Sequence, residues 1–360
     1  MCESFVNFCK NNPQADVVHF WLADFPNNHC ECEECQKKLP SDWYVQLMNE
    51  IDEMLTKEDI KTKIVFLLYY DLLWAPQVEK IKNYDRFIIM FAPASRDYGK
   101  NYGDFLEFEG ELSPFVRNKL DMPRSLSANI EHLRRWQKGF EGDGFAYEYH
   151  LMWSHSGDFG YEKCARNLHG DIKDLEKIGL NGFISAQPQK TFMPSSLPFD
   201  IMAETLWNKE CDYDTFSLDY YKSAFGEDGE KVQKYLKNLS ALTLLYDQPV
   251  FGDKLKPYGP YCTDYDALSK EISDFAEVID ENIKNDSQCK ADWVYLKAHA
   301  EYLTLSAKAM KLREGGEDEK AEEAFKEVKE WARKNEMKLR KVFEVGDTAG
   351  TLERKIFKQK

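Results

Sequence analysis

The feature that most limits the fold of this chain is a series of five short apolar runs within its first 208 residues. Each run is rich in β-branched and aromatic residues. The runs are DVVHFWLAD (16–24), KIVFLLYYD (63–71), RFIIMFAP (86–93), GFAYEYHLMW (144–153) and GFISAQPQ (182–189). Runs of this length and composition are typical of parallel strands that are buried on both faces. The sequence therefore predicts five strands of a parallel sheet.

Helical patterns lie between most of these strands. The segment SDWYVQLMNEIDEML begins with Ser41, a capping residue, while RSLSANIEHLRRWQK and EKCARNLHGDIKDLEKIG carry apolar residues at three and four spacing. An α/β chain of this kind forms either an open doubly wound sheet or part of a barrel. Four of the five strands end on polar groups suited to catalysis, as barrel strands do, and no glycine-rich phosphate loop follows a strand. We expect a (β/α)8 TIM-type barrel over residues 1–208, apparently incomplete, with about five C-terminal βα units.

The pattern changes from residue 209 onward. Three long segments have helical periodicity and no strand signal, namely 264–283, 291–312 and 319–343. The sequence predicts a C-terminal α-helical domain over 209–360, which we interpret as a packing or oligomerisation module.

Charge and composition exclude several classes of protein. The net charge is -15, which disfavours a nucleic-acid partner, since such proteins usually present a basic face. No apolar run is long enough for a membrane span, and the first residues lack the pattern of a signal peptide. Nine cysteines, an odd number without framework spacing, fit a reducing compartment. As written, the chain is expected to be cytoplasmic.

Glu148 is the most informative single residue. It lies in FAYEYHLMW, among Tyr147 and other aromatic residues of a strand expected to be buried, where a carboxyl group is costly unless it is paired or functional. Desolvation would raise its pKa toward that of a general acid. The alternative is a structural glutamate satisfied by a nearby Arg or Lys. His150 is expected on the same face, and Trp153 could stack on substrate.

Two aspartates end the preceding strands. Asp24 closes the first strand, where it either points into the mouth of a barrel or caps a turn. Asp71 closes the second, with Tyr70 and Trp74 beside it, an arrangement that suits a sugar subsite or a helix cap.

Three further residues follow strands and could contact substrate. Arg96 follows the third strand and either clamps a carboxylate or hydroxyls, or forms a loop salt bridge. Gln187 and Gln189 follow the fifth strand, and their amides suit hydroxyl or acetamido groups or unpaired backbone groups.

Cys30, Cys32 and Cys35 have the spacing of soft-metal ligands, with His29 beside them. A closed zinc site needs four ligands, and no second CxxC or CxxH is present. A structural zinc, a Cys32–Cys35 disulfide and reduced thiols all remain open, and we interpret the cluster as a structural clasp. No cofactor is required by the pattern.

These segments resemble a known bacterial family. The similarity lies in the strand that ends on an acid and is followed by Asn-Asn, C-x-C-x-x-C and SDWY. It extends to KIVFLLYYDLLWAP, FAPASRDYG, the Tyr-Glu-Tyr strand and GLNGFISAQPQ. In these motifs the chain is similar to domain of unknown function 4838, which is partly classed as glycoside hydrolase family 163. The resemblance covers roughly residues 1 to 245. It implies a (β/α)8 barrel that hydrolyses β-linked N-acetylglucosamine in glycans by a retaining, substrate-assisted route of endo type.

The resemblance also implies roles and an incomplete barrel. Glu148 takes the general-acid role, Asp71 orients the acetamide, and Asp24 is the second-choice partner. The chain departs from relatives in reading SAQPQ after the last strand. If the cysteine loop follows barrel strand four, three strands precede it in a parent protein, which would be secreted or periplasmic if a signal peptide precedes them. The exposed edge of the first strand then predicts a homo-oligomer or aggregation. The competing hypothesis is a non-catalytic carbohydrate-binding or scaffold protein.

Overall fold

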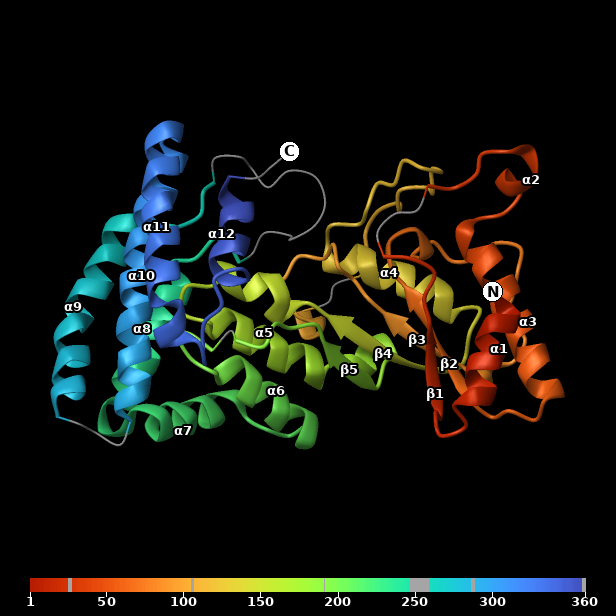
Figure 1. Ribbon diagram of the computed structural model, residues 1–360, viewed down its shortest axis with the longest axis horizontal. Coiled ribbons are helices and arrows are strands. Elements are labelled where there is room, and N and C mark those ends of the chain that lie inside the picture. The colour runs from red at the N-terminus through yellow and green to blue at the C-terminus, as the bar shows by residue number, and fades with distance from the viewer. Residues whose placement is uncertain (25–27, 105–106, 191, 247–258, 286–288, 358–360) are drawn as a thin grey trace. The chain divides into compact units, whose positions relative to one another are not determined.

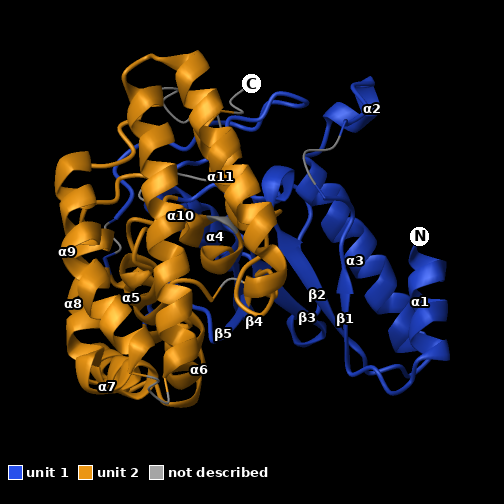
Figure 2. Ribbon diagram, turned by 60° about the vertical axis from the view of Figure 1, so that its left-hand side comes forward, with its two compact units in different colours: residues 1–96, 104–148, 174–184 blue, residues 97–103, 149–173, 185–360 orange. Residues whose placement is uncertain are grey.

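The computed structural model describes residues 1–24, 28–104, 107–190, 192–246, 259–285 and 289–357, apart from the side chain of Trp153. The chain divides into two compact units (Figure 2). Unit 1 consists of residues 1–96, 104–148 and 174–184, and unit 2 consists of residues 97–103, 149–173 and 185–360.

Unit 1 contains a five-stranded sheet in the order β1-β2-β3-β4-β5 (Figure 1). Its strands are β1 (Val17–Phe20), β2 (Lys63–Leu68), β3 (Phe87–Phe91), β4 (Asp143–Glu148) and β5 (Gly182–Ser185). Its helices are α1 (Cys2–Asn11), α2 (Glu33–Gln36), α3 (Pro40–Lys57) and α4 (Leu126–Gln137). The strands β1 to β4 pair in parallel, so the α/β class and the five predicted strands are confirmed.

One face of the sheet packs on helices. Phe20 and Phe66 are register partners on β1 and β2 and therefore point to the same face. The Phe20 ring lies 5.5 Å from that of Tyr44 on α3, and the Phe66 ring lies 5.6 Å from that of Trp136 on α4. Burial of these large rings stabilises unit 1.

The sheet is curved, and its other face is concave. His19 of β1 and Phe145 of β4 are three strands apart, which in a flat sheet is about 14 Å at the usual strand spacing of ~4.8 Å. Their ring centroids are only 6.2 Å apart, and those of Trp21 and Tyr147 are 6.3 Å apart. Side chains from β1 and β4 therefore lean toward one another across the concave face, as they do inside part of a barrel.

Helix α3 holds the first two strands together and differs slightly from the sequence expectation. The Tyr44 hydroxyl donates to the Phe20 carbonyl and accepts from the backbone N–H of Leu67. The helix begins at Pro40, so Ser41 lies inside the first turn rather than at the cap. The capping carboxyl is that of Asp42, which accepts from the backbone N–H of Leu39.

Strand β1 lies at one edge of the sheet. Two of the apolar side chains near it, Val17 and Trp21, are exposed. Unpaired strand edges favour pairing with another chain. Self-association through this edge stays a prediction.

The fourth strand ends earlier than its apolar run. It stops at Glu148, and a π-helical turn covers His150–Ser154. The expectation that His150 shares a strand face with Glu148 is therefore corrected. The physical reason is a buried hydrogen bond, because His150 Nε2 lies 2.7 Å from Asp171 Oδ2 on the next helix.

Unit 2 is helical. Its helices are α5 (Glu162–Lys173), α6 (Leu197–Trp207), α7 (Tyr213–Phe225), α8 (Gly229–Ala241), α9 (Tyr265–Lys284), α10 (Lys290–Glu314), α11 (Asp318–Leu339) and α12 (Thr348–Ile356). The three long helices expected after residue 209 are present as α9, α10 and α11. The unit also includes α5 and α6, which precede the expected boundary at 208, because α5 packs on α6 and α8. Among the described helices, none is both long and apolar enough to cross a membrane.

Candidate active site

The carboxyl ends of β1 and β2 bring an aspartate and several phenols together in unit 1. Asp24, four residues after β1, is exposed, and its Oδ1 accepts a hydrogen bond from the Tyr69 hydroxyl at 3.1 Å. The rings of Tyr69 and Tyr70 meet edge to face with centroids 4.5 Å apart. Tyr147, near the end of β4, also interacts electrostatically with Asp24. An aspartate therefore lies among three phenols, which we call the Asp24 cluster.

The phenols of the Asp24 cluster stay protonated near neutral pH. Burial, followed by Tyr70 and Asp24, raises the pKa of Tyr69 far above its usual range. Burial and then the charge of Asp24 raise the pKa of Tyr70 and of Tyr147. Each hydroxyl can therefore donate a hydrogen bond to a carboxylate or to a ligand oxygen.

The backbone of the Asp24 cluster is strained at Tyr70. This residue has a φ of +48°, in the left-handed region that side chains other than glycine rarely adopt. Such a conformation costs on the order of 1–3 kcal/mol and is found most often at functional sites. It starts the short 3-10 turn Tyr70–Leu72, which contains Asp71.

Asp71 pairs with a histidine from the cysteine loop. His29 Nε2 lies 2.6 Å from Asp71 Oδ2, and the Asp71 side chain is 4% exposed whereas that of His29 is 21% exposed. The pair connects the segment after β1 to the end of β2. The histidine fixes the orientation of the carboxyl group while its own ring stays accessible to solvent.

Aromatic rings line the concave face beside the Asp24 cluster. Trp21 is 47% exposed and meets the half-buried Tyr147 edge to face at 6.3 Å. Burial lowers the pKa of the neighbouring His19, so its ring is neutral at physiological pH. Exposed apolar rings next to a carboxylate and phenols form a surface suited to a sugar ring, which has apolar faces and a polar rim.

Glu148 is not free in this structure. Its Oε1 accepts from Nη1 of Arg96 at 2.8 Å, and both side chains are 0% exposed. The alternative of a structural glutamate satisfied by an arginine therefore matches the geometry. The same contact shows Arg96 in a salt bridge rather than as an open clamp for substrate.

The remaining predicted site residues do not join the Asp24 cluster. Trp74 is buried, donates from Nε1 to the Ser113 carbonyl at 2.8 Å and packs on His132, so its ring serves the core of unit 1. His150 lies in unit 2 in its pair with Asp171.

Three further residues expected to contact substrate follow the fourth and fifth strands. Gln187 and Gln189 are exposed residues of unit 2. The side chain of Trp153 lies outside the described part of the structure.

The three cysteines of the loop are close together. Cys30 and Cys32 are exposed and Cys35 is half-buried, and none forms a disulfide. Their sulfur atoms all lie within 4.8 Å of one another. A hydrogen bond from the backbone of Cys35 and bonds from the Cys30 and Cys35 side chains lower the pKa of Cys32 to about 7.

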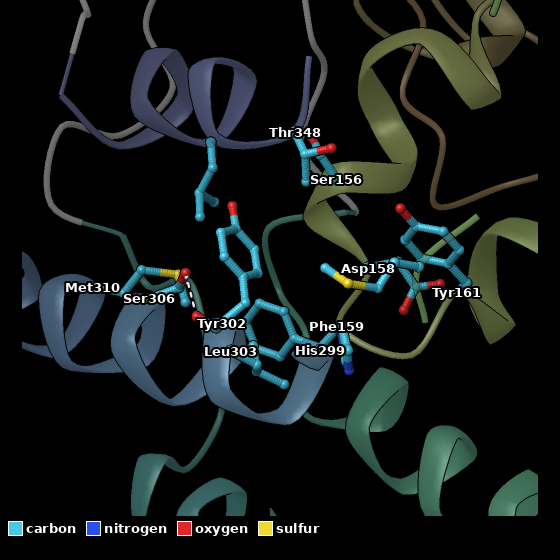
Figure 3. Close-up of a pocket in the computed structure, with 12 residues that line it drawn as sticks. Ser156, Asp158, Phe159, Tyr161, His299, Tyr302, Leu303, Ser306, Met310 and Thr348 are labelled. Atoms are coloured by element: carbon cyan, nitrogen blue, oxygen red, sulfur yellow. Dashed lines mark hydrogen bonds between the residues drawn. The ribbon is translucent and has the colours of Figure 1, made fainter. Parts of the chain in front are cut away.

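Two hollows elsewhere are poor substrate sites. The cavity of unit 2 in Figure 3, lined by residues including Asp158, His299 and Tyr302, holds about 30 Å³, which is the space of one water molecule. A larger hollow of about 720 Å³ lies at the amino ends of β1 and β2, beside Asp16 and Lys63. Ligands of parallel α/β sheets bind at the carboxyl ends of the strands, where the Asp24 cluster lies.

Sequence reasoning missed three members of this region. His19 lies on β1 and Trp21 follows two residues later, just after the strand, as Phe145 and Tyr147 are spaced on β4. This two-residue period could have indicated a shared inner face. Tyr69 lies directly before Tyr70 and Asp71, and its partner Asp24 is 45 residues away in the sequence. The partnership of His29 with Asp71 has no local signal, because 42 residues separate them.

Comparison of the chain with protein-family models, with curated proteins and with solved structures found no match.

Proposed function

We propose that this protein is a glycoside hydrolase that acts on glycans containing β-linked N-acetylglucosamine, and that the Asp24 cluster is its reaction centre. One observation carries the proposal. Two aspartates, three phenols and an exposed tryptophan gather at the carboxyl ends of β1, β2 and β4 in unit 1. We take the curved five-stranded sheet as part of a (β/α)8 barrel, whose reactive groups occupy this end of the strands. The resemblance described above supplies the substrate class.

Asp24 and Asp71 have different roles in the proposed retaining, substrate-assisted reaction. In that reaction the 2-acetamido oxygen of the sugar attacks the anomeric carbon while an acid protonates the leaving oxygen. Asp71, fixed by His29, orients the acetamide through its nitrogen. Asp24 is exposed and hydrogen-bonded to Tyr69. It donates a proton to the leaving oxygen and then takes a proton from the attacking water.

Glu148 has a different role in this proposal from the one implied by the resemblance. Its carboxylate already accepts from Arg96 and has no contact with solvent, whereas a general acid must reach the leaving oxygen. We therefore assign Glu148 the role of positioning Tyr147, a member of the Asp24 cluster, because Glu148 directly follows Tyr147 at the end of β4.

Hydrolysis of a chromogenic β-N-acetylglucosaminide and of an N-linked core glycopeptide tests the proposal. Asp24→Asn and Asp71→Asn should each lower kcat by about 10²–10⁴-fold. The matching β-glucoside, which lacks the acetamide, should not be cleaved. Asp85→Asn is a matched control on the short turn before β3. Hydrolysis of the β-N-acetylglucosaminide or of the glycopeptide by Asp24→Asn at the wild-type rate would contradict the assignment of Asp24 as the acid.

The buried Arg96–Glu148 pair favours one second candidate, a non-catalytic carbohydrate-binding protein with the same aromatic face. Calorimetric titration with N-acetylglucosamine oligosaccharides separates the two. Binding without hydrolysis at any pH would identify the binding protein, and hydrolysis would exclude it.

A further inference from the structure

The three cysteines after β1 converge although no disulfide joins them. The sulfur atoms of Cys30, Cys32 and Cys35 lie within 4.8 Å of one another, so some point lies no more than about 2.8 Å from all three. A zinc–sulfur bond is about 2.3 Å long. A movement of roughly half an ångström per side chain would therefore bring three thiolates into bonding distance of one ion.

We propose that Cys30, Cys32 and Cys35 bind one zinc ion, which stiffens the loop that presents His29 to Asp71. The metal site itself does not depend on the proposed hydrolase activity. Each thiol gives its proton to solvent as the metal binds. With three protein ligands, the fourth position is filled by water, because two of the cysteines are exposed.

Backbone amides already point at the sulfur atoms. The N–H of Cys32 donates to Cys30 Sγ at 3.5 Å, and the backbone of Cys35 hydrogen-bonds to the Cys32 sulfur. Amide donors of this kind orient metal-bound thiolates and offset their negative charge. The backbone of the loop therefore already faces two of the three sulfur atoms, those of Cys30 and Cys32.

The charge around the cluster also fits a cation. Glu31, Glu33 and Glu34 alternate with the cysteines and are exposed. Glu34 forms an ion pair with Lys37 at 2.5 Å. Thiolate ligands select soft or borderline ions, and among the common divalent ions zinc fits this preference.

Both ends of the loop are tied to a second segment of unit 1. The side chain of Asn118 accepts from the His29 N–H at 2.7 Å, and it donates to the His29 carbonyl at 2.9 Å and to Glu31 at 2.8 Å. Arg117 donates to the carbonyls of Cys35 and Lys38 at 2.9 and 2.8 Å.

The three cysteines lie within the stretch of loop that Asn118 and Arg117 hold at its two ends. A metal bound by the three cysteines restricts this stretch, and with it the angle at which His29 meets Asp71.

Cobalt substitution tests the proposal directly. The full chain, reduced and freed of metal with a chelator, is titrated with Co²⁺ alone. We expect one ion per chain, with the thiolate charge-transfer bands and intense d–d bands of tetrahedral Co²⁺, and displacement of the cobalt by Zn²⁺. Cys32→Ser should abolish these bands. Cys289→Ser, at a half-exposed cysteine of unit 2, should leave them unchanged.

Thiol labelling gives an independent readout. With Zn²⁺ present, three thiols of the wild type should react at least tenfold more slowly than in the chelator-treated protein, while the Cys32→Ser variant loses this protection. The circular dichroism spectrum of the variant checks that it is folded. Absence of cobalt bands in the folded wild type, or equal cobalt binding by Cys32→Ser and wild type, would overturn the proposal. A disulfide that survives mild reductant and blocks cobalt would overturn it as well.

Discussion

Nη1 of Arg96 donates to Oε1 of Glu148 at 2.8 Å, and neither side chain exposes any surface to solvent. The two residues follow β3 and end β4, so their ion pair joins the carboxyl ends of neighbouring strands. Attraction between buried charges must offset the cost of removing both from water. The pair therefore sets the geometry of the strand ends next to the Asp24 cluster.

Removal of one partner of this pair should be costly. Glu148→Gln removes the negative charge from this buried contact and should lower the free energy of unfolding by about 3–5 kcal/mol. Urea denaturation followed by circular dichroism measures the change. Glu131→Gln breaks the exposed Arg135–Glu131 pair and should cost less than about 1 kcal/mol. Equal effects of the two substitutions would show that burial does not strengthen the Arg96–Glu148 contact.

The Tyr69 hydroxyl should matter for the reaction more than for the fold. Tyr69→Phe removes the donor to Asp24 while keeping the ring, and a hydrogen bond to a charged group contributes about 1.5–3 kcal/mol. We expect kcat/KM for the chromogenic substrate to fall roughly tenfold or more. Tyr84→Phe, at an exposed tyrosine before β3, is the matched control. An unchanged kcat/KM in Tyr69→Phe would remove the Asp24 cluster from the mechanism.

Trp21 should contribute to glycan affinity by stacking. Trp21→Ala removes an exposed ring from the concave face and should weaken binding of an N-acetylglucosamine oligosaccharide by about tenfold, measured by calorimetry. Trp207, at the end of α6, is 91% exposed and outside unit 1, so Trp207→Ala is the control. If both variants bind as the wild type does, the ligand does not use the concave face.

A buried histidine of unit 2 should make stability depend on pH. Burial lowers the pKa of His299 from 6.5 to about 3, so the unfolded chain takes up a proton at a higher pH than the folded chain. The stability is therefore complete above pH 6.5 and is lost as the pH falls toward 3. Between pH 6.5 and 5 this histidine alone should remove about 2 kcal/mol.

The slope of stability against pH for His299→Gln checks this prediction. Asp158 lines the same cavity, and burial raises the pKa of its carboxyl group, which acts in the opposite direction. The difference between the variant and the wild type isolates His299, and His19→Gln, at a more exposed ring, should change the slope less. Identical slopes for His299→Gln and wild type would mean that His299 is not held neutral.

The strands could be predicted from the sequence because short apolar runs of eight to ten residues, rich in β-branched and aromatic residues, leave few other structures possible. Their ends could not. The run 144–153 stays apolar beyond Glu148, yet the chain turns there into a π-helix, because His150 pairs with Asp171, 21 residues away. Distant partners of this kind decide where a strand stops.

The site was predictable to the same extent. Asp24 and Asp71 could be singled out because each follows a strand, and position along a strand is a local property. Whether Glu148 is free or paired depends on Arg96, which is 52 residues away, and one sequence does not reveal that distance in space. Trp74 likewise resembled a platform for substrate, although its indole N–H binds a carbonyl 39 residues away in the core.

The division of the chain into its two units has a practical consequence for protein engineering. Residues 97–103 and 149–173 belong to the helical unit although they lie between stretches of the sheet unit. No single cut of the polypeptide yields either unit whole, and expression of residues 1–208 alone would leave α5 without α8, whose Ser240 donates to Asp158 just ahead of it. Unit 1, which carries the Asp24 cluster, is therefore best produced together with unit 2. Truncation of the C-terminal helices to improve crystals would remove contacts that residues 149–173 need in order to fold.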